Sequence, residues 1–434
     1  MVKVRYAPSP TGNPHVGNIR TALFTYLFAR HHKGQFQLRI EDTDKKREIP
    51  ESYSEILDSL KWLGLTWDGK PIMQSRRLDI YKAHAQKLLQ SGKAYEQEGA
   101  IYFKTEKNGQ TSWTDLVRNK MITFDNRTQE DFVILKSDGW PTYHLASVVD
   151  DHLMGITHVT RGEDWVSSTP KHIMLYQAFG WKLPKFAHFP NILATDRSKL
   201  SKRHGSIGIL DFKKDGFLPE ALINYLALLG WTPPSGKEIL SLDEMVLEFD
   251  LKDINIAPAV FDVVKLEWLN GEYIRKYQIS NIKYQILEYL KYLTGGNMPD
   301  HPTEDELESV VPLIKERIKK LSDFIPLTQF LWGKPEYDQK VYEKLNIKNK
   351  KEALSEVLDV MTDMEKPWKA DTFEESFRML AEKLGLSATQ MFQLIRVAIS
   401  GQTVTPPLFE SIKILGEQET TERIKVAIDF QMGL

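Results

Sequence analysis

The chain contains no cysteine, which excludes disulfides and thiolate-ligated zinc and fits a reducing compartment. It also has no apolar run long enough to span a bilayer. The alternation of apolar and polar residues that begins at Val2 leaves no room for a signal or transit peptide. We therefore predict a cytoplasmic protein with no membrane contact and no zinc.

The chain also lacks an excess of charge of either sign, because its formal net charge is −2. Bulk charge thus gives no argument for nucleic-acid binding, and any RNA contact must come from local basic patches. Hydrophobic residues make up 41% and charged residues 27% of the 434 positions. This composition is typical of a soluble globular protein of about three domains.

The most informative stretch is Arg5 to Gly17, which reads RYAPSPTGNPHVG. The alternation over residues 2–6 predicts a strand, and apolar residues at helical spacing over 16–27 predict a helix closed by Gly34. The turn between them places unpaired backbone N–H groups and a partial positive charge at the helix start, where phosphate binds well. An ordinary turn before an ordinary helix is the alternative.

An α/β pattern follows. Residues 35–41 alternate as a strand and end at Glu41, where a carboxylate would face a ligand in an open α/β sheet. The pattern breaks over 94–139 and then resumes, so we predict a parallel sheet split in sequence by an insertion. The expected elements are helices at 53–63, 78–89 and 169–179, strands at 132–135, 157–161 and 186–193, and a hairpin turn at Asn108–Gly109.

Beyond residue 209 the periodicity becomes helical. Apolar faces at helical spacing recur around 217–229, 282–293, 311–325, 354–361, 373–384 and 392–399. Breaks at Gly295–Gly296 and 405–407 indicate loops within helical domains.

A second stretch, Asp196 to Gly205, holds Lys199 and Lys202 three residues apart among small polar residues such as Ser201. Such a cationic loop could close over a polyphosphate and neutralise the charge that develops as it leaves. A solvated basic loop has the same composition.

A third stretch runs from Gly139 to Trp165. Tyr143 and Ser147 lie four residues apart, a spacing that puts both on one face if this segment is helical. Arg161 and Arg5 each end a strand, and two arginines that converge on one pocket favour an acidic small molecule between them. Alternatively, Arg161 pairs with a carboxylate at 163–164 and holds a loop.

Two further groups are assigned no ligand role. His31–His32 ends a helix, where it suits the helix dipole. Asp150–Asp151 next to His152 is an unspecific candidate for a metal site.

In this order, the three stretches resemble one family, the class I aminoacyl-tRNA synthetases, and within it the bacterial-type glutamyl-tRNA synthetases. Residues 7–12 (APSPTG) resemble the family signature that leads into its "HIGH" motif, here His15 to Asn18. Residues 199–203 (KLSKR) resemble the "KMSKS" loop, and 143–165 are similar to the amino-acid pocket.

The resemblance implies a two-step reaction. Glutamate attacks the α-phosphate of ATP, and the glutamyl group then passes to a ribose hydroxyl of tRNA(Glu). Magnesium is expected with the ATP, and no protein metal ligands are assigned. The implied glutamate-binding residues are Arg5, Ser9, Glu41, Tyr143, Ser147 and Arg161. The implied ATP-binding residues are Thr11, His15, Gly17, Glu163, Ser201 and Lys202, with catalytic roles for His15, Lys199 and Lys202.

The implied fold is a Rossmann-type parallel-sheet catalytic domain with a short insertion, followed by all-α anticodon-binding domains. The expected boundaries are 1–93 and 143–210 for the two catalytic halves, 94–142 for the acceptor-end insertion, 211–280 for a stem-contact region, and 281–370 and 371–434 for two anticodon-binding domains. The resemblance also implies a monomeric, cytoplasmic enzyme.

Three departures from the family pattern matter. Asn18 replaces the last histidine of the "HIGH" motif, and the insertion is much shorter than usual and lacks zinc-binding cysteines. Where discriminating enzymes carry an anticodon-reading arginine, a loose alignment reaches Met361. The chain is therefore predicted to accept tRNA(Gln) as well as tRNA(Glu).

Two basic clusters are hypothetical contacts to tRNA phosphates, at 315–320 and at 344–351. Three other functions compete with the synthetase interpretation: a tRNA-modifying glutamyl transferase paralogue, a non-catalytic tRNA-binding adapter, and a generic nucleotidyl transferase. The helical half after residue 280 disfavours the first and third, and a retained pyrophosphate clamp disfavours the second.

Overall fold

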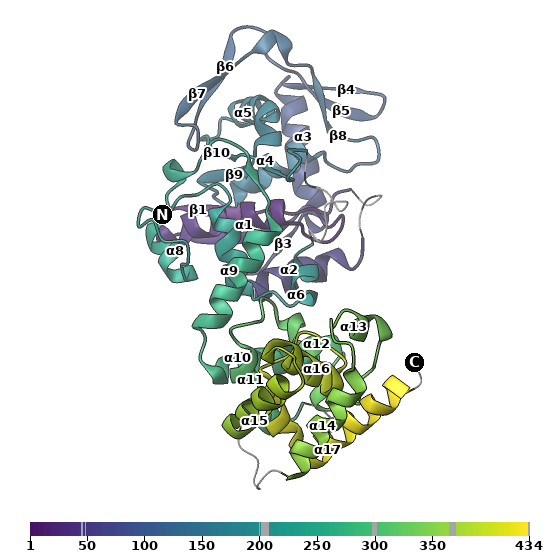
Figure 1. Ribbon diagram of the computed structural model, residues 1–434. Coiled ribbons are helices and arrows are strands. Elements are labelled where there is room, and N and C mark those ends of the chain that lie inside the picture. Colours follow the sequence, from purple (N-terminus) through teal and green to yellow (C-terminus); the bar gives the residue numbers. More distant parts are fainter. Residues whose placement is uncertain are drawn as a thin grey trace. The chain divides into compact units, whose positions relative to one another are not determined.

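The computed structural model of the chain describes residues 1–44, 47, 49–198, 200, 208–296, 302–363 and 370–432 (Figure 1). The chain divides into two compact units, unit 1 (Met1–Leu269) and unit 2 (Asn270–Leu434). No helix in the described ranges is long and apolar enough to cross a membrane.

Unit 1 is built around parallel strands from two separate stretches of its sequence. Strand β1 (Lys3–Tyr6) pairs in parallel with β2 (Gln35–Ile40), and β2 with β3 (Ile72–Met73). Strand β10 (Lys185–Phe189) pairs in parallel with β9 (His158–Gly162). The two groups meet where the backbone N–H of Thr157 donates to the carbonyl of Lys3 (2.9 Å). The predicted parallel sheet, split in sequence, is confirmed.

The remaining elements of unit 1 connect and cover these strands. The helices are α1 (Val16–His31), α2 (Ser52–Trp62), α3 (Leu78–Gln90), α4 (Tyr143–Leu153), α5 (Thr169–Ala178), α6 (Ile209–Lys214), α7 (Pro219–Leu228), α8 (Leu242–Glu248) and α9 (Val263–Lys276), which continues past the unit boundary. The further strands are β4 (Ala94–Gln97), β5 (Ala100–Phe103), β6 (Gln110–Asp115), β7 (Lys120–Asp125), β8 (Phe132–Leu135), β11 (Ile192–Leu193) and β12 (Ala259–Val260).

Helix α1 is the central helix of unit 1, and its apolar residues are buried on nearly every side. It ends one residue earlier than predicted, because His32 is the C-cap and Lys33, rather than Gly34, takes a left-handed conformation (φ 49°) just after it. Gly34 is required for a different reason. A Cβ at this position would lie 2.3 Å from the carbonyl oxygen of Val2, so the glycine allows β1 to pass closely.

The predicted insertion forms two separate pieces. Strands β4, β5 and β8 make an antiparallel sheet, whereas β6 joins the catalytic strands by pairing in parallel with β10. The prediction of a hairpin turn at Asn108–Gly109 is wrong. The hairpin joins β6 to β7 through residues 116–119, and Gly109 lies at its open end, where its carbonyl accepts from the N–H of Asn126 (3.1 Å).

Two predicted elements are interrupted. The strand expected over 186–193 ends at Phe189, because Pro190 has no N–H to donate, and a short strand β11 follows. The helix expected over 311–325 is also divided. Helix α11 (Glu304–Ile314) stops before the basic run at 315–320, and the chain becomes helical again in α12 (Phe324–Thr328).

Unit 2 is helical, as predicted. Besides α11 and α12 it contains α10 (Ile279–Leu293), α13 (Gln339–Glu343), α14 (Lys350–Asp363), α15 (Ala370–Lys383), α16 (Ala388–Ser400) and α17 (Leu408–Met432), which is broken at Gly416. Apolar residues of α13 to α17 form one core, so the boundary predicted between 281–370 and 371–434 separates helices that pack together. The finer boundaries predicted inside the two units stay predictions.

Candidate active site

A cleft of about 350 Å³ opens at the carboxyl ends of the parallel strands of unit 1, where ligands bind in open α/β sheets. Eight of the predicted site residues line it: Arg5, Ser9, Thr11, His15, Gly17, Glu41, Tyr143 and Arg161. Ser147 and Glu163 do not line it. Lys199, Ser201 and Lys202 lie outside the described residues, although Leu200 contributes to the wall.

The turn between β1 and α1 shapes one wall of the cleft. Gly12 has φ 143°, a conformation that side chains rarely adopt, so this position demands glycine. His15 caps α1, and its Nδ1 accepts from the N–H of Gly17 (3.2 Å). The neutral ring therefore carries its proton on Nε2. A Cβ at Gly17 would lie 3.1 Å from the His15 ring, so glycine keeps the helix start open to a ligand.

Arg161 stands at the end of β9 and is 5% exposed. Its partners among the described residues are all neutral: the guanidinium donates to His188 Nε2 (3.1 Å), Tyr143 Oη (3.4 Å), His172 Nδ1 (3.3 Å) and Thr169 Oγ1 (2.8 Å). Burial lowers its pKa, and the nearby charge of Arg5 lowers it further. A buried cation surrounded by neutral partners is suited to bind an anion.

The alternative role of Arg161, a structural pair with an acidic neighbour, is wrong for Glu163. The Glu163 carboxylate forms an ion pair with Arg118 (2.8 Å) and accepts from the backbone N–H of Asn191 (2.9 Å). Within the described parts of the chain, no carboxylate lies within ion-pair distance of Arg161. Its positive charge therefore remains available to a ligand.

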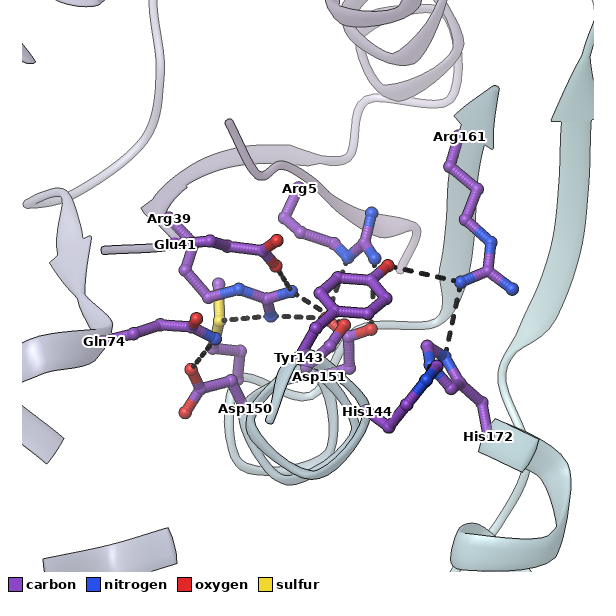
Figure 2. A network of polar contacts seen from close by, with 12 residues as sticks. Arg5, Arg39, Glu41, Gln74, Tyr143, His144, Asp150, Asp151, Arg161 and His172 are labelled. Atoms are coloured by element: carbon purple, nitrogen blue, oxygen red, sulfur yellow. Dashed lines mark hydrogen bonds and ion pairs between the residues drawn. The ribbon is translucent and has the colours of Figure 1, made fainter. Parts of the chain in front are cut away.

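Arg5 is different, because its charge is already compensated. Figure 2 shows Asp151 between two arginines: Arg5 Nε (2.8 Å) and Arg39 Nη1 (2.6 Å) both donate to Asp151 Oδ1. Arg39 Nη2 continues the network to Glu41 (2.9 Å) and to the hydroxyl of Ser147 (3.2 Å). The predicted residue Ser147 thus contacts Arg39, behind the cleft wall.

Burial and ion pairing shift the pKa values of the carboxylates in this network in opposite directions. Burial favours the neutral acid at Asp151, but Arg39 and Arg5 outweigh it and hold the pKa of Asp151 below its usual range. At Glu41 burial prevails over Arg39 and raises the pKa. The two arginines and two carboxylates carry no net charge when ionised, so this network offers a ligand no excess charge.

The metal interpretation of Asp150–Asp151 and His152 finds no support. Asp150 accepts from Gln74 (2.9 Å), Arg77 (2.8 Å) and Tyr81 (2.7 Å). The His152 ring stacks on Trp181 instead, with 3.8 Å between centroids. Among the residues that the structure describes, no group of three His, Asp or Glu side chains is placed to hold a metal ion.

Comparisons with known proteins agree with this geometry. Residues 1–100 and 96–268 match the family model "tRNA synthetases class I (E and Q), catalytic domain", and residues 284–428 match "Anticodon binding domain". The chain belongs to the class I tRNA synthetases for glutamate and glutamine.

Relatives of this synthetase match it over its whole length. It is 41% identical to glutamate–tRNA ligase 1 of Caldanaerobacter subterraneus subsp. tengcongensis, with 99% of this chain and 98% of the relative covered. It is 42% identical to a glutamate–tRNA ligase of Dehalococcoides mccartyi (98% and 97% covered). A crystal structure of a glutamate tRNA ligase from Elizabethkingia meningosepticum in complex with its amino acid superposes with TM-score 0.84 at 32% identity, with 99% of each chain covered.

Sequence reasoning missed several polar residues of the synthetase site. Arg39 and Asp151 are both buried, and their contact joins positions 112 residues apart. His172 and His188 stand alone in the sequence but meet at Arg161. Arg20 is 2% exposed, lines the cleft and donates to the carbonyls of Leu229 (2.8 Å) and Pro190.

The histidines behind Arg161 have fixed tautomers. Because a guanidinium only donates, His172 Nδ1 accepts from Arg161, and the other nitrogen of His172 donates to His144 Nδ1 (3.1 Å). Burial lowers the pKa of His172 well below its ordinary value and that of His144 to about 4. Both rings are therefore neutral near pH 7.

This pair makes the synthetase sensitive to acid. Between pH 6.5 and 4 the unfolded state binds a proton at His144 that the folded state does not, so the free energy of unfolding falls as the pH falls through this window. In a His144→Asn variant the amide oxygen still accepts from His172, but position 144 no longer titrates. We expect the variant to lose about 3 kcal/mol less than the parent between pH 7 and 4 in urea unfolding. Parallel losses in the two proteins would contradict the prediction.

Proposed function

We propose that this synthetase joins L-glutamate to tRNA through glutamyl-adenylate, with glutamate and ATP bound side by side in the cleft of unit 1. The observation that carries the proposal is the charge of Arg161, which is buried among neutral groups. Glutamate carries a net charge of −1 at neutral pH, which suits a buried cation whose described partners are neutral groups. Glutamine, with a neutral side chain, would leave this charge unmatched.

The amino acid is assigned to the inner part of the cleft. Arg161 and Arg5 are proposed to bind its two carboxylates, in an order that we leave open. Glu41 is proposed to accept from the α-ammonium group, and Ser9 and Tyr143 to complete the hydrogen bonds. This arrangement holds the α-carboxylate toward the nucleotide, so that the protein contributes mainly positioning and electrostatic stabilisation.

ATP is assigned to the start of α1. The backbone N–H groups near Gly17, the Nε2–H of His15 and the hydroxyl of Thr11 are suited to phosphate oxygens. One carboxylate oxygen of glutamate then attacks the α-phosphorus, and the bond to the β-phosphate oxygen breaks to release pyrophosphate. Contacts of Lys199, Ser201 and Lys202 to the leaving pyrophosphate are part of the proposal, as is a contact from Glu163 to ATP.

Magnesium is proposed to enter with the ATP phosphates. The described residues offer no cluster of carboxylates or histidines that would hold the ion without them, and Mg²⁺ commonly keeps phosphate and water ligands in such sites. In the second step the terminal ribose hydroxyl of tRNA attacks the carbonyl carbon of glutamyl-adenylate, and AMP leaves.

The match of residues 284–428 to an anticodon-binding domain supports tRNA as the second substrate. It also argues against a tRNA-modifying paralogue, which would resemble the catalytic half alone. Met361 is 1% exposed in the core of unit 2, so this position contributes no side chain to anticodon reading. We therefore propose acceptance of tRNA(Gln) beside tRNA(Glu), by a monomeric cytoplasmic enzyme.

The two basic clusters, 315–320 and 344–351, differ in the surroundings of their cationic side chains. Arg317 donates to the carbonyl of Thr405 (3.0 Å) and Lys350 to that of Ile347 (2.8 Å), so both side chains have structural contacts. Lys348 borders a hollow of about 510 Å³ near α14 and α16. The cluster at 344–351 is therefore the stronger proposal for a backbone contact to the anticodon arm.

The direct test is aminoacylation with radiolabelled glutamate and purified tRNA(Glu) and tRNA(Gln), assayed separately at one salt concentration. We expect both tRNAs to be charged with glutamate, and neither with radiolabelled glutamine. Charging of tRNA(Glu) alone would contradict the broad tRNA specificity. No charging of either tRNA would contradict the proposed activity and favour a non-catalytic adapter.

A further inference from the structure

A row of three buried side chains connects the β6–β7 hairpin to Arg161. Arg161 Nε donates to His188 Nε2 (3.1 Å), and His188 Nδ1 lies 2.6 Å from Asp115 Oδ2. Asp115 and His188 are 0% exposed and Arg161 is 5% exposed. Because a guanidinium only donates, His188 Nε2 must accept, so the proton of the neutral ring lies on Nδ1 and is donated to Asp115.

The orientation of Asp115 is itself fixed. Its other oxygen, Oδ1, accepts from the backbone N–H groups of Val117 (3.2 Å) and Arg118 (3.1 Å) in the turn of the hairpin. Asp115 also lies opposite Phe186 where β6 pairs with β10, two residues before His188. Oδ2 is thereby directed at the His188 ring.

We propose that Asp115 is a positioning residue for glutamate binding, which acts through His188 to hold the guanidinium of Arg161. The carboxylate selects the tautomer of His188 that presents a lone pair to Arg161 Nε. It thereby fixes the orientation of the Arg161 guanidinium, which is proposed to bind the substrate carboxylate. This inference rests on the proposed role of Arg161.

The isosteric substitution Asp115→Asn separates this role from a merely structural one. The two backbone N–H groups hold the amide oxygen at the Oδ1 position, so the amide NH2 faces His188 Nδ1. His188 Nδ1 must then accept from this amide, so the ring carries its proton on Nε2. Two donors, the Nε2–H of His188 and the Nε–H of Arg161, then face each other. The change is therefore expected to disturb Arg161 without changing the volume of the side chain.

The experiment measures the KM values for glutamate and ATP in aminoacylation by the full-length enzyme. Asp115→Asn is expected to raise the KM for glutamate at least about tenfold, as for a misdirected hydrogen bond to a charged group, and to leave the KM for ATP within about twofold. Asp125→Asn is the matched control, because it makes the same change in the same hairpin at an exposed ion pair with Arg127. It should leave both KM values unchanged.

A second pair of variants tests the path through His188. His188→Leu removes both hydrogen bonds and is expected to raise the KM for glutamate, and adding Asp115→Asn should raise it no further, since the two residues act in series. The double variant also leaves no buried carboxylate unpaired. If Asp115→Asn alone does not fold, the KM for glutamate of the double variant, compared with that of His188→Leu, still tests whether the two residues act in series.

The outcomes separate this inference from the proposed function. If Arg161→Lys, measured in parallel, keeps a normal KM for glutamate, the assignment of Arg161 is wrong. If Arg161→Lys raises that KM but Asp115→Asn does not, only the role of Asp115 is overturned. Additive effects of Asp115→Asn and His188→Leu, or equal rises in both KM values, would also overturn it.

Discussion

Arg161→Ala is expected to raise the KM of this synthetase for glutamate by about 30-fold to 5,000-fold while ATP binding changes less than about threefold. The substitution removes a buried cation of the cleft whose described partners are all neutral. Truncation of one member of a buried, hydrogen-bonded charge pair costs about 2 to 5 kcal/mol or more. Glutamate-dependent pyrophosphate exchange with tRNA present measures the loss, and equilibrium dialysis measures ATP binding.

The matched control is Arg127→Ala. Arg127 is exposed and pairs with Asp125 on the hairpin, so its removal should leave exchange and ATP binding unchanged. Near-normal exchange in Arg161→Ala would contradict the assignment of Arg161 to glutamate. Equal losses of glutamate and ATP binding would indicate a collapsed cleft instead.

Asp151→Ala is expected to cause the largest loss of stability, about 3 to 5 kcal/mol in the free energy of unfolding. The carboxylate is 2% exposed and accepts from two arginines that are themselves 4% and 0% exposed. Its removal leaves Arg5 and Arg39 buried without their shared partner, and breaking a buried ion pair from one side typically costs this much. Denaturant unfolding of the full chain at pH 7 measures the change.

Asp125→Ala provides the stability control, because an exposed ion pair contributes about 0 to 1 kcal/mol. A loss below about 1 kcal/mol for Asp151→Ala would show that water or a rearranged carboxylate compensates the two arginines. The network in Figure 2 would then be less rigid than its distances indicate.

The sequence predicted the elements that depend on local pattern. Alternation placed β1 and β2, helical spacing placed α1, α2 and α3, and parallel strands then brought Arg5, Glu41 and Arg161 to one end of the sheet. Residues that follow strands in an α/β sheet converge because the strands are parallel. This geometric rule, together with the motifs, was enough to find the cleft.

The sequence did not predict what lies behind the cleft. Arg39 lies in an alternating strand, where an arginine is normally assigned to a solvated face, yet it is 0% exposed because Asp151 and Glu41 compensate its charge. A single sequence carries no sign of such long-range pairing. The hairpin turn was missed for a related reason: turn preference favoured Asn108–Gly109, whereas β6 pairs with β7 and with the distant strand β10.

The pairing of β6 with β10 also bears on self-association. Strand β7 is the outermost strand of the order β7-β6-β10-β9, and its solvent-facing positions include Lys120 and the 68% exposed Met121. Without this hairpin, β10 would present a row of unpaired N–H and C=O groups, a template for edge-to-edge aggregation. An antiparallel outer strand that begins with a lysine and ends with an aspartate is a poor template for another chain. The β6–β7 hairpin therefore protects this edge of the sheet from adding strands of neighbouring molecules.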